Sequence, residues 1–134
     1  MSTLDLEQNN LPLVVAKFGG TSVADFQAML RCAHIIKNDR NTRLVVVSAS
    51  AGVTNYLVRL SQENLSIQEQ RDIVVNIRAI QLNITQHLAT DVEQALNVEI
   101  ELLLEQLSSH ALMQSKQYSV KQVDAILSYG EQFS

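Results

Sequence analysis

Residues 13–22 read LVVAKFGGTS, an apolar run closed by two glycines and two hydroxyl residues. The part from Leu13 to Phe18 is rich in β-branched side chains, which favours a strand buried on both faces over an amphipathic helix. Residues 43–48, which read RLVVVS, repeat the pattern. The sequence therefore predicts two buried strands, and each of them runs into a turn of small residues.

The segment between these strands predicts a helix from Ala24 to Asn38. Its apolar residues recur at helical spacing, and Ser22 or Asp25 is available near its start as a cap. The apolar positions are Phe26, Leu30, Ala33 and Ile36. Strand, helix and strand make a βαβ unit, whose strands are parallel and whose crossover is right-handed in nearly all proteins. We therefore predict an α/β fold that starts with a parallel βαβ unit.

After Thr54 the pattern predicts helix almost to the end of the chain. Three capping boxes mark helix starts, each with a Ser or Thr three residues before a Glu or Gln. The boxes are Ser66 with Glu69, Thr90 with Glu93, and Ser119 with Gln122. An apolar stripe follows each box, and the second and third stripes are predicted to include Val92, Leu96, Leu103 and Leu107, and Val120, Val123, Ile126 and Leu127.

The composition is that of one globular domain. The chain has 134 residues, 46% of them apolar, and a formal net charge of −4 that favours neither nucleic acid nor an anionic membrane as a partner. No apolar run approaches the roughly 20 residues of a membrane span, and the polar N-terminus is unlike a secretory signal. We expect a cytoplasmic protein in which residues 1–12 form a flexible extension.

The cysteine and histidines indicate neither a disulfide nor a metal site. Cys32 is the single cysteine and falls on the helical pattern, so we predict a small buried core residue. His34, His87 and His110 lie in separate helical segments without a second ligand at metal-binding spacing. We therefore expect no metal held by protein side chains.

The first turn, at residues 19–22, joins a strand to a helix. Without Cβ atoms at Gly19 and Gly20, backbone amides can approach an anion closely, while Thr21 and Ser22 add hydroxyl donors. Lys17 precedes the glycines, so the segment is neither a Walker A loop nor the dinucleotide motif GxGxxG. A phosphate cradle is one interpretation, and a purely structural tight turn is the other.

The second turn, at residues 48–54 (SASAGVT), also leads from a strand into a helix. Parallel strands end on the same side of a sheet, so both turns are expected to open toward one crevice, where open α/β sheets bind ligands. Ser48, Ser50 and Thr54 could donate to phosphate or carboxylate oxygens. The alternative is that Ser50 or Thr54 is a plain helix cap.

Three strings in this order resemble the aspartate kinases, and most closely the lysine-sensitive type. They are KFGGTS at residues 17–22, SASAGVT at 48–54 and SYGE at 128–131. The resemblance implies the N-terminal part of the amino-acid kinase α/β sandwich. It also implies transfer of the γ-phosphoryl group of MgATP to the side-chain carboxylate of L-aspartate, which gives 4-phospho-L-aspartate for lysine, threonine and methionine synthesis. The enzyme is expected to be a homo-oligomer.

The same resemblance assigns roles to individual residues. Lys17 would be the catalytic residue, stabilising charge on the transferring phosphoryl group. The ATP phosphates would be wrapped by Gly19, Gly20, Thr21 and Ser22 together with Lys17. L-Aspartate would be held by Ser48, Thr54 and Glu131. No residue is assigned to a metal, because Mg²⁺ enters with ATP as part of the co-substrate.

Two parallel strands make a poor sheet, so residues 13–134 are expected to be a truncated catalytic domain without measurable kinase activity of its own. Two other interpretations stay open. The acceptor could instead be glutamate, acetylglutamate or a nucleotide. The chain could also be a non-catalytic helical interaction module, because amphipathic helix makes up more than half of it and an open sheet edge invites association.

Overall fold

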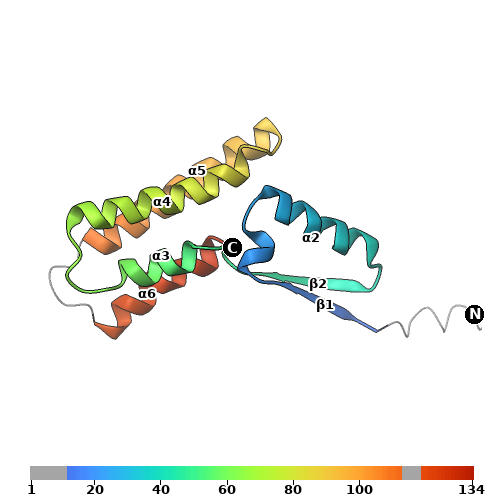
Figure 1. Ribbon diagram of the computed structural model, residues 1–134, viewed down its shortest axis with the longest axis horizontal. Coiled ribbons are helices and arrows are strands. Elements are labelled where there is room, and N and C mark those ends of the chain that lie inside the picture. Colours follow the sequence, from blue (N-terminus) through green and yellow to red (C-terminus); the bar gives the residue numbers. More distant parts are fainter. Residues whose placement is uncertain (1–11, 113–118) are drawn as a thin grey trace, which may run out of the picture.

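The computed structural model describes residues 12–112 and 119–134, so residues 1–11 of the predicted extension lie outside the described part. The chain starts with strand β1 (Val14–Phe18), the 3-10 turn η2 (Gly20–Val23), helix α2 (Phe26–Asn38) and strand β2 (Thr42–Val47). Helices α3 (Val53–Leu60), α4 (Ile67–Thr85), α5 (Thr90–Leu112) and α6 (Val120–Gln132) follow. Figure 1 shows the strands and α2 at one end of the molecule and these helices at the other. The predicted α/β class is confirmed.

The two strands are parallel, as a βαβ unit requires. Lys17 pairs with Val46 and Phe18 with Val47, so Lys17 and Val46 point to one face of the sheet and Phe18 and Val47 to the other. Helix α2 lies over the second face and covers it only in part, because Phe18 and Val47 line a cavity together with Cys32 of that helix.

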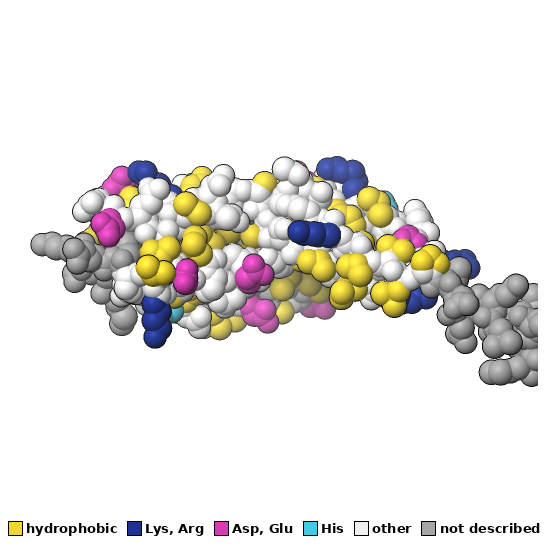
Figure 2. Space-filling view, turned by 90° about the horizontal axis from the view of Figure 1, so that it is seen from below, with side chains coloured by type: hydrophobic (Ala, Val, Ile, Leu, Met, Phe, Trp, Pro, Cys, Tyr) yellow, Lys and Arg dark blue, Asp and Glu magenta, His cyan; other side chains and the backbone are white. Residues whose placement is uncertain are grey.

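The opposite face of the sheet is exposed, so the prediction of strands buried on both faces was wrong. Val15, Leu44 and Val46 are 53%, 54% and 41% exposed. Figure 2 views this side of the molecule and shows hydrophobic side chains gathered over the strand end. The physical reason is that, within residues 12–112 and 119–134, α2 lies over one side of the sheet and no helix lies on the other. Even under α2 the cover is loose, because Val45 and Val47 are 38% and 43% exposed.

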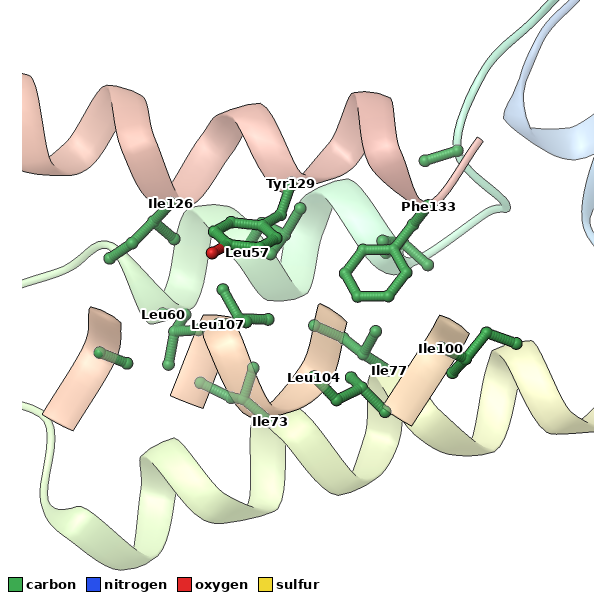
Figure 3. Close-up of a cluster of buried hydrophobic side chains, with 13 residues drawn as sticks. Leu57, Leu60, Ile73, Ile77, Ile100, Leu104, Leu107, Ile126, Tyr129 and Phe133 are labelled. Carbon is green, nitrogen blue, oxygen red and sulfur yellow. The ribbon is translucent and has the colours of Figure 1, made fainter. Parts of the chain in front are cut away.

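The main hydrophobic core lies between α3, α4, α5 and α6 (Figure 3). Its fully buried side chains are Val53, Leu57, Leu60, Ile77, Leu107 and Ile126. Helix α4 begins with the predicted capping box, since the Glu69 amide donates to Ser66 Oγ at 3.1 Å and the Ser66 amide donates to Glu69 Oε2 at 2.8 Å. At the start of α6, the Ser119 amide donates to Gln122 Oε1 at 2.8 Å.

The predicted cap of α5 was wrong, and the predicted apolar stripes of α5 and α6 were wrong in part. Thr90 is the first residue of α5 and not its cap, because the Glu93 amide donates to the Ala89 carbonyl at 2.8 Å. Val92, Leu96, Val120 and Leu127, which were expected in the apolar stripes, are exposed. The predicted stripe members Leu107 and Ile126 are fully buried, and α5 also buries Ile100, Leu104 and Ala111. It carries apolar residues on more than one side, so spacing alone did not show which side packs against α4 and α6.

Helices α3 and α6 lie side by side in opposite directions, which brings the end of α6 to the start of α3 (Figure 3). A Cβ placed on Gly130 of α6 would lie 3.6 Å from Leu57 Cδ1 of α3. The residues that follow Gly130 therefore lie near the first turn of α3, which itself follows β2 directly. This pairing carries the last segment of the chain to the ends of the strands.

Candidate functional site

The first turn after β1 is anchored by hydrogen bonds from both of its sides. The Ser22 amide donates to the Gly19 carbonyl at 2.9 Å, which forms the short turn η2. The Cys32 thiol, buried on α2, donates to the Ser22 carbonyl at 3.1 Å. Lys17, Gly19 and Thr21 are exposed, so a ligand could reach them. The predicted burial of Cys32 is confirmed, and this thiol holds the turn.

Helix α2 starts two residues later than the sequence predicted, because η2 occupies the chain as far as Val23. Of the two candidate caps, Asp25 is the one used: its Oδ1 accepts from the Ala28 amide at 2.8 Å. Ser22 is therefore not engaged in capping α2, and no described side chain bonds its hydroxyl. Its hydroxyl thus remains available to a ligand.

The second turn changes direction at Gly52, whose φ of 94° lies in the left-handed region that favours glycine. Gly52 itself is the N-cap residue of α3, and no side chain caps this helix. The Val53 amide donates to the Ser50 carbonyl at 3.1 Å. The alternative in which Ser50 or Thr54 caps the helix is therefore wrong, and Thr54 lies exposed on its first turn.

The two turns touch each other. The Ser48 amide donates to the Phe18 carbonyl at 3.1 Å, and the Ala51 amide donates to the Gly20 carbonyl at 3.1 Å. A Cβ on Gly20 would lie only 3.0 Å from the Ala49 carbonyl oxygen, so the close approach depends on glycine. The expected juxtaposition of the two turns at one edge of the sheet is confirmed. Nothing in the residue pattern indicated that Ala49 and Ala51 would make the contact.

The third segment, at the end of α6, reaches the same region. Phe133 and Ser134 line one cavity with Phe18 and Ser48 at the strand ends, and Figure 1 places the C-terminal end beside the start of α3. Glu131 is exposed and makes no ion pair with any described residue. Its side chain is therefore free to meet a cation, although it does not line that cavity.

The polar groups at this end of the molecule suit an anion next to a cation. Lys17 is the sole basic residue and Glu131 the sole acidic residue of the strings 17–22, 48–54 and 128–131. Lys17, the hydroxyls and the backbone amides can contact phosphate oxygens, while Glu131 can contact an ammonium group. In the described part of the chain, no group of three His, Cys, Asp or Glu side chains could hold a metal ion.

Comparison with known proteins identifies the family. Residues 12–132 match the model of the amino acid kinase family. This chain belongs to the amino acid kinase family. Among described proteins of that family, it is 45% identical over 122 residues to the lysine-sensitive aspartokinase 3 of Escherichia coli, a match that covers 91% of this chain and 26% of the relative.

The chain also resembles a much shorter relative. It is 47% identical over 91 residues to a Haemophilus influenzae protein named "Putative inactive aspartokinase 3", which covers 66% of this chain and 71% of the relative. This chain is therefore similar both to a lysine-sensitive aspartokinase and to a protein whose name describes it as inactive.

Solved structures agree with these matches. The crystal structure of E. coli aspartokinase III in complex with aspartate and ADP superimposes with a TM-score of 0.83 at 45% identity, covering 90% of this chain and 26% of that one. The same enzyme in complex with lysine and aspartate gives a TM-score of 0.82. The predicted likeness to aspartokinases is confirmed, and the chain spans about a quarter of the length of this relative.

Proposed function

We propose that the chain contributes the phosphate-binding and acceptor-binding turns of an aspartate kinase. The reaction is transfer of the γ-phosphoryl group of ATP to the side-chain carboxylate of L-aspartate, giving 4-phospho-L-aspartate, the first step toward lysine, threonine and methionine. The observation that carries the proposal is the direct contact between the turns, through Ala51 and Gly20. Support comes from the similar enzyme whose structure holds aspartate and ADP.

In this proposal the first turn binds the nucleotide. Lys17 places its ammonium group beside the transferring phosphoryl group and stabilises the charge that develops there, which is the main task in phosphoryl transfer. Gly19 and Gly20 let backbone amides approach the phosphates, and the hydroxyls of Thr21 and Ser22 donate to phosphate oxygens. The Cys32 thiol keeps this turn against α2 by its bond to the Ser22 carbonyl.

The second turn and the end of α6 bind the acceptor. Ser48 and Thr54 donate hydroxyl hydrogen bonds to the carboxylates of L-aspartate, and Glu131 pairs with its ammonium group. No general base is required, because the attacking carboxylate is already ionised at neutral pH. Thr54 and Glu131 are both exposed and lie at the same end of the antiparallel pair α3 and α6, which supports a shared ligand.

Mg²⁺ enters this site as part of the co-substrate. Mg²⁺ is commonly bound through substrate phosphates and retained water, with one or two carboxylates. That fits a described region in which no three acidic or His/Cys side chains form a metal cluster.

The described helices include none that is long and apolar enough to cross a membrane. We propose a cytoplasmic homo-oligomer, with residues 13–134 as the N-terminal part of the catalytic domain and residues 1–12 as an extension.

The 134-residue chain alone is expected to show no measurable kinase activity. Its sheet has two strands with one exposed apolar face, so the nucleotide would be held from one side only. Release of ADP in the presence of ATP and L-aspartate, measured with a coupled assay, should not exceed that of the Lys17→Ala variant. Activity above this control would contradict the expectation.

A chimera tests the proposed roles directly. Residues 12–132 would replace the matching region of E. coli lysine-sensitive aspartokinase 3, which is 45% identical. The chimera should phosphorylate L-aspartate, and Lys17→Ala should lower kcat by about 10²- to 10³-fold, as expected on losing one stabilising charge. Glu131→Gln should mainly raise KM for L-aspartate. A folded chimera without activity, or one indifferent to Lys17→Ala, would refute the proposal.

A non-catalytic function is the second candidate, and one observation favours it. The chain covers 71% of a relative whose name describes it as inactive. In that case the exposed apolar face would serve association, and size-exclusion chromatography with light scattering would find a stable oligomer. The chimera distinguishes the two candidates, because an inactive but folded chimera together with an oligomeric chain supports the second.

A further inference from the structure

Helix α2 and the face of the sheet beneath it border a cavity of about 280 Å³ that extends from Ser48 of the candidate site to side chains without a role in the proposed reaction. Its deep end is formed by Val23, Cys32, Ser50 and Phe133, which are 4%, 8%, 3% and 7% exposed. Its outer end lies at Val45, which is 38% exposed. A small molecule could therefore enter beside β2 and reach buried side chains behind the two turns.

Ser50 is the polar group that marks this cavity as a binding site. Its carbonyl accepts a hydrogen bond from the Val53 amide, but its hydroxyl has no partner among residues 12–112 and 119–134. The residue is 97% buried, as its 3% exposure implies. Because Ser50 lines the cavity and its hydroxyl bonds no described residue, the hydroxyl can bond a ligand that offers a donor or an acceptor.

The rest of the lining defines the chemistry of that ligand. No Asp, Glu, Lys or Arg side chain lines the cavity in the described part of the chain, and most of the lining is apolar. An apolar protein cavity of about 150 Å³ already admits a benzene ring. The cavity therefore suits a compact neutral molecule with an aromatic or short aliphatic body and one hydrogen-bonding group.

We propose that this cavity is a binding site for a small neutral alcohol or carbonyl compound, whose polar group bonds Ser50 Oγ and whose apolar body packs against α2. Such a ligand contacts both turns of the candidate site. Cys32 lines the cavity and bonds the Ser22 carbonyl of the first turn, while Ser48 and Ser50 belong to the second. The site does not depend on the assignment of kinase activity.

Benzyl alcohol and toluene are suitable probes, because they share a ring and differ by one hydroxymethyl group. Each would be titrated into the ¹⁵N-labelled 134-residue chain and followed by NMR. Both should give saturable shifts at the amides of Val23, Cys32 and Ser50. Ser50→Ala should weaken benzyl alcohol binding about fivefold, the scale of one hydrogen bond, and change toluene binding less than about twofold.

Two further variants control the experiment. Ser109→Ala removes an exposed hydroxyl on α5, which bonds the Glu105 carbonyl, and should change neither affinity. Ala33→Phe places a large side chain in the cavity lining and should weaken both probes. Lack of saturable shifts with both probes in the unmodified chain overturns the site. An unchanged ratio of the two affinities in Ser50→Ala, or binding unaffected by Ala33→Phe, overturns it as well.

Discussion

The amide of Ala51 donates a 3.1 Å hydrogen bond to the carbonyl oxygen of Gly20, and this bond joins the turns that follow the two parallel strands. The two turns can approach this closely because residue 20 is glycine. A Cβ at that position would lie 3.0 Å from the Ala49 carbonyl oxygen. The geometry of the candidate site therefore depends on one glycine of the pair, and the pair can be tested residue by residue.

Gly20→Ala is expected to destabilise the chain by about 1–3 kcal/mol, because its Cβ would overpack against a backbone oxygen 3.0 Å away. Gly19→Ala is the matched control. Its φ of −77° suits any residue, and a Cβ there meets nothing within 4 Å, so its free energy of unfolding should change by less than about 1 kcal/mol. Urea unfolding followed by circular dichroism measures both. Equal effects at the two positions would argue against the contact.

Gly52→Ala is expected to cost about 1–2 kcal/mol, because alanine is strained at a φ of 94°. Gly130→Ala should act in the opposite direction. Gly130 lies inside α6, and its added Cβ would make an ordinary contact 3.6 Å from Leu57 Cδ1, so stability should rise by about 0.5–1 kcal/mol. Thermal and urea unfolding of both variants test this difference in sign.

Asp39 is expected to make folding sensitive to acid. The Asn41 amide and the Thr42 hydroxyl donate to its carboxylate at 3.0 Å and 2.7 Å, and these bonds, the amide first, lower the pKa of Asp39 below its ordinary value of 3.8. A lowered folded-state pKa means stability that is present above pH 3.8 and is lost as the pH falls through the folded pKa.

In Asp39→Asn, the free energy of unfolding should therefore fall less steeply as the pH is lowered. Unfolding free energies of the two proteins would be compared from pH 6 down to pH 3, and the gap between them should narrow toward low pH. A gap that stays constant over this range would show that the charge of Asp39 is not involved. Asp72→Asn serves as a control, because Asp72 accepts only a side-chain bond from Gln68 on the exposed side of α4.

His110 and Tyr129 should be energetically coupled across α5 and α6. His110 Nδ1 and Tyr129 Oη are 2.6 Å apart, and the tyrosine is 4% exposed, a burial that raises the pKa of its hydroxyl. His110→Ala should cost more in the presence of Tyr129 than in Tyr129→Phe, because only the first leaves a buried hydroxyl unpaired. A double-mutant cycle at pH 7 should give about 0.5–1.5 kcal/mol of coupling, and a value near zero would contradict the bond.

Local signals in the sequence were sufficient for the strands, the crossover helix and the turns. Gly52 and Gly20 marked the turns because few residues tolerate a left-handed backbone, as at Gly52, or a closely approached one, as at Gly20. The box at Ser66 and Glu69 predicted the start of α4 because both partners lie within one helical turn. The likeness to aspartokinases followed from three short strings at these same turns.

The features that escaped prediction depend on residues distant in sequence. The exposure of Val46 depends on whether anything packs against that face of the sheet, which strand composition cannot reveal. The exposure of Val92 and Leu96 depends on the side of α5 that meets α4 and α6. The position of Ser50 in the cavity depends on how α2 lies over the sheet. From the sequence, Ser50 could be predicted only as a possible helix cap.

The return of α6 to α3 has a consequence for how the protein is made. Leu57 leaves the ribosome early, but Ile126, Tyr129 and Phe133, which complete its surroundings, are translated near the end of this sequence. During synthesis the part of α3 that packs against α6 therefore stays uncovered after α4 has formed, which makes the nascent chain a substrate for chaperones and proteases. Slow translation before residue 120 would lengthen that exposure, whereas rapid translation of α6 would shorten it.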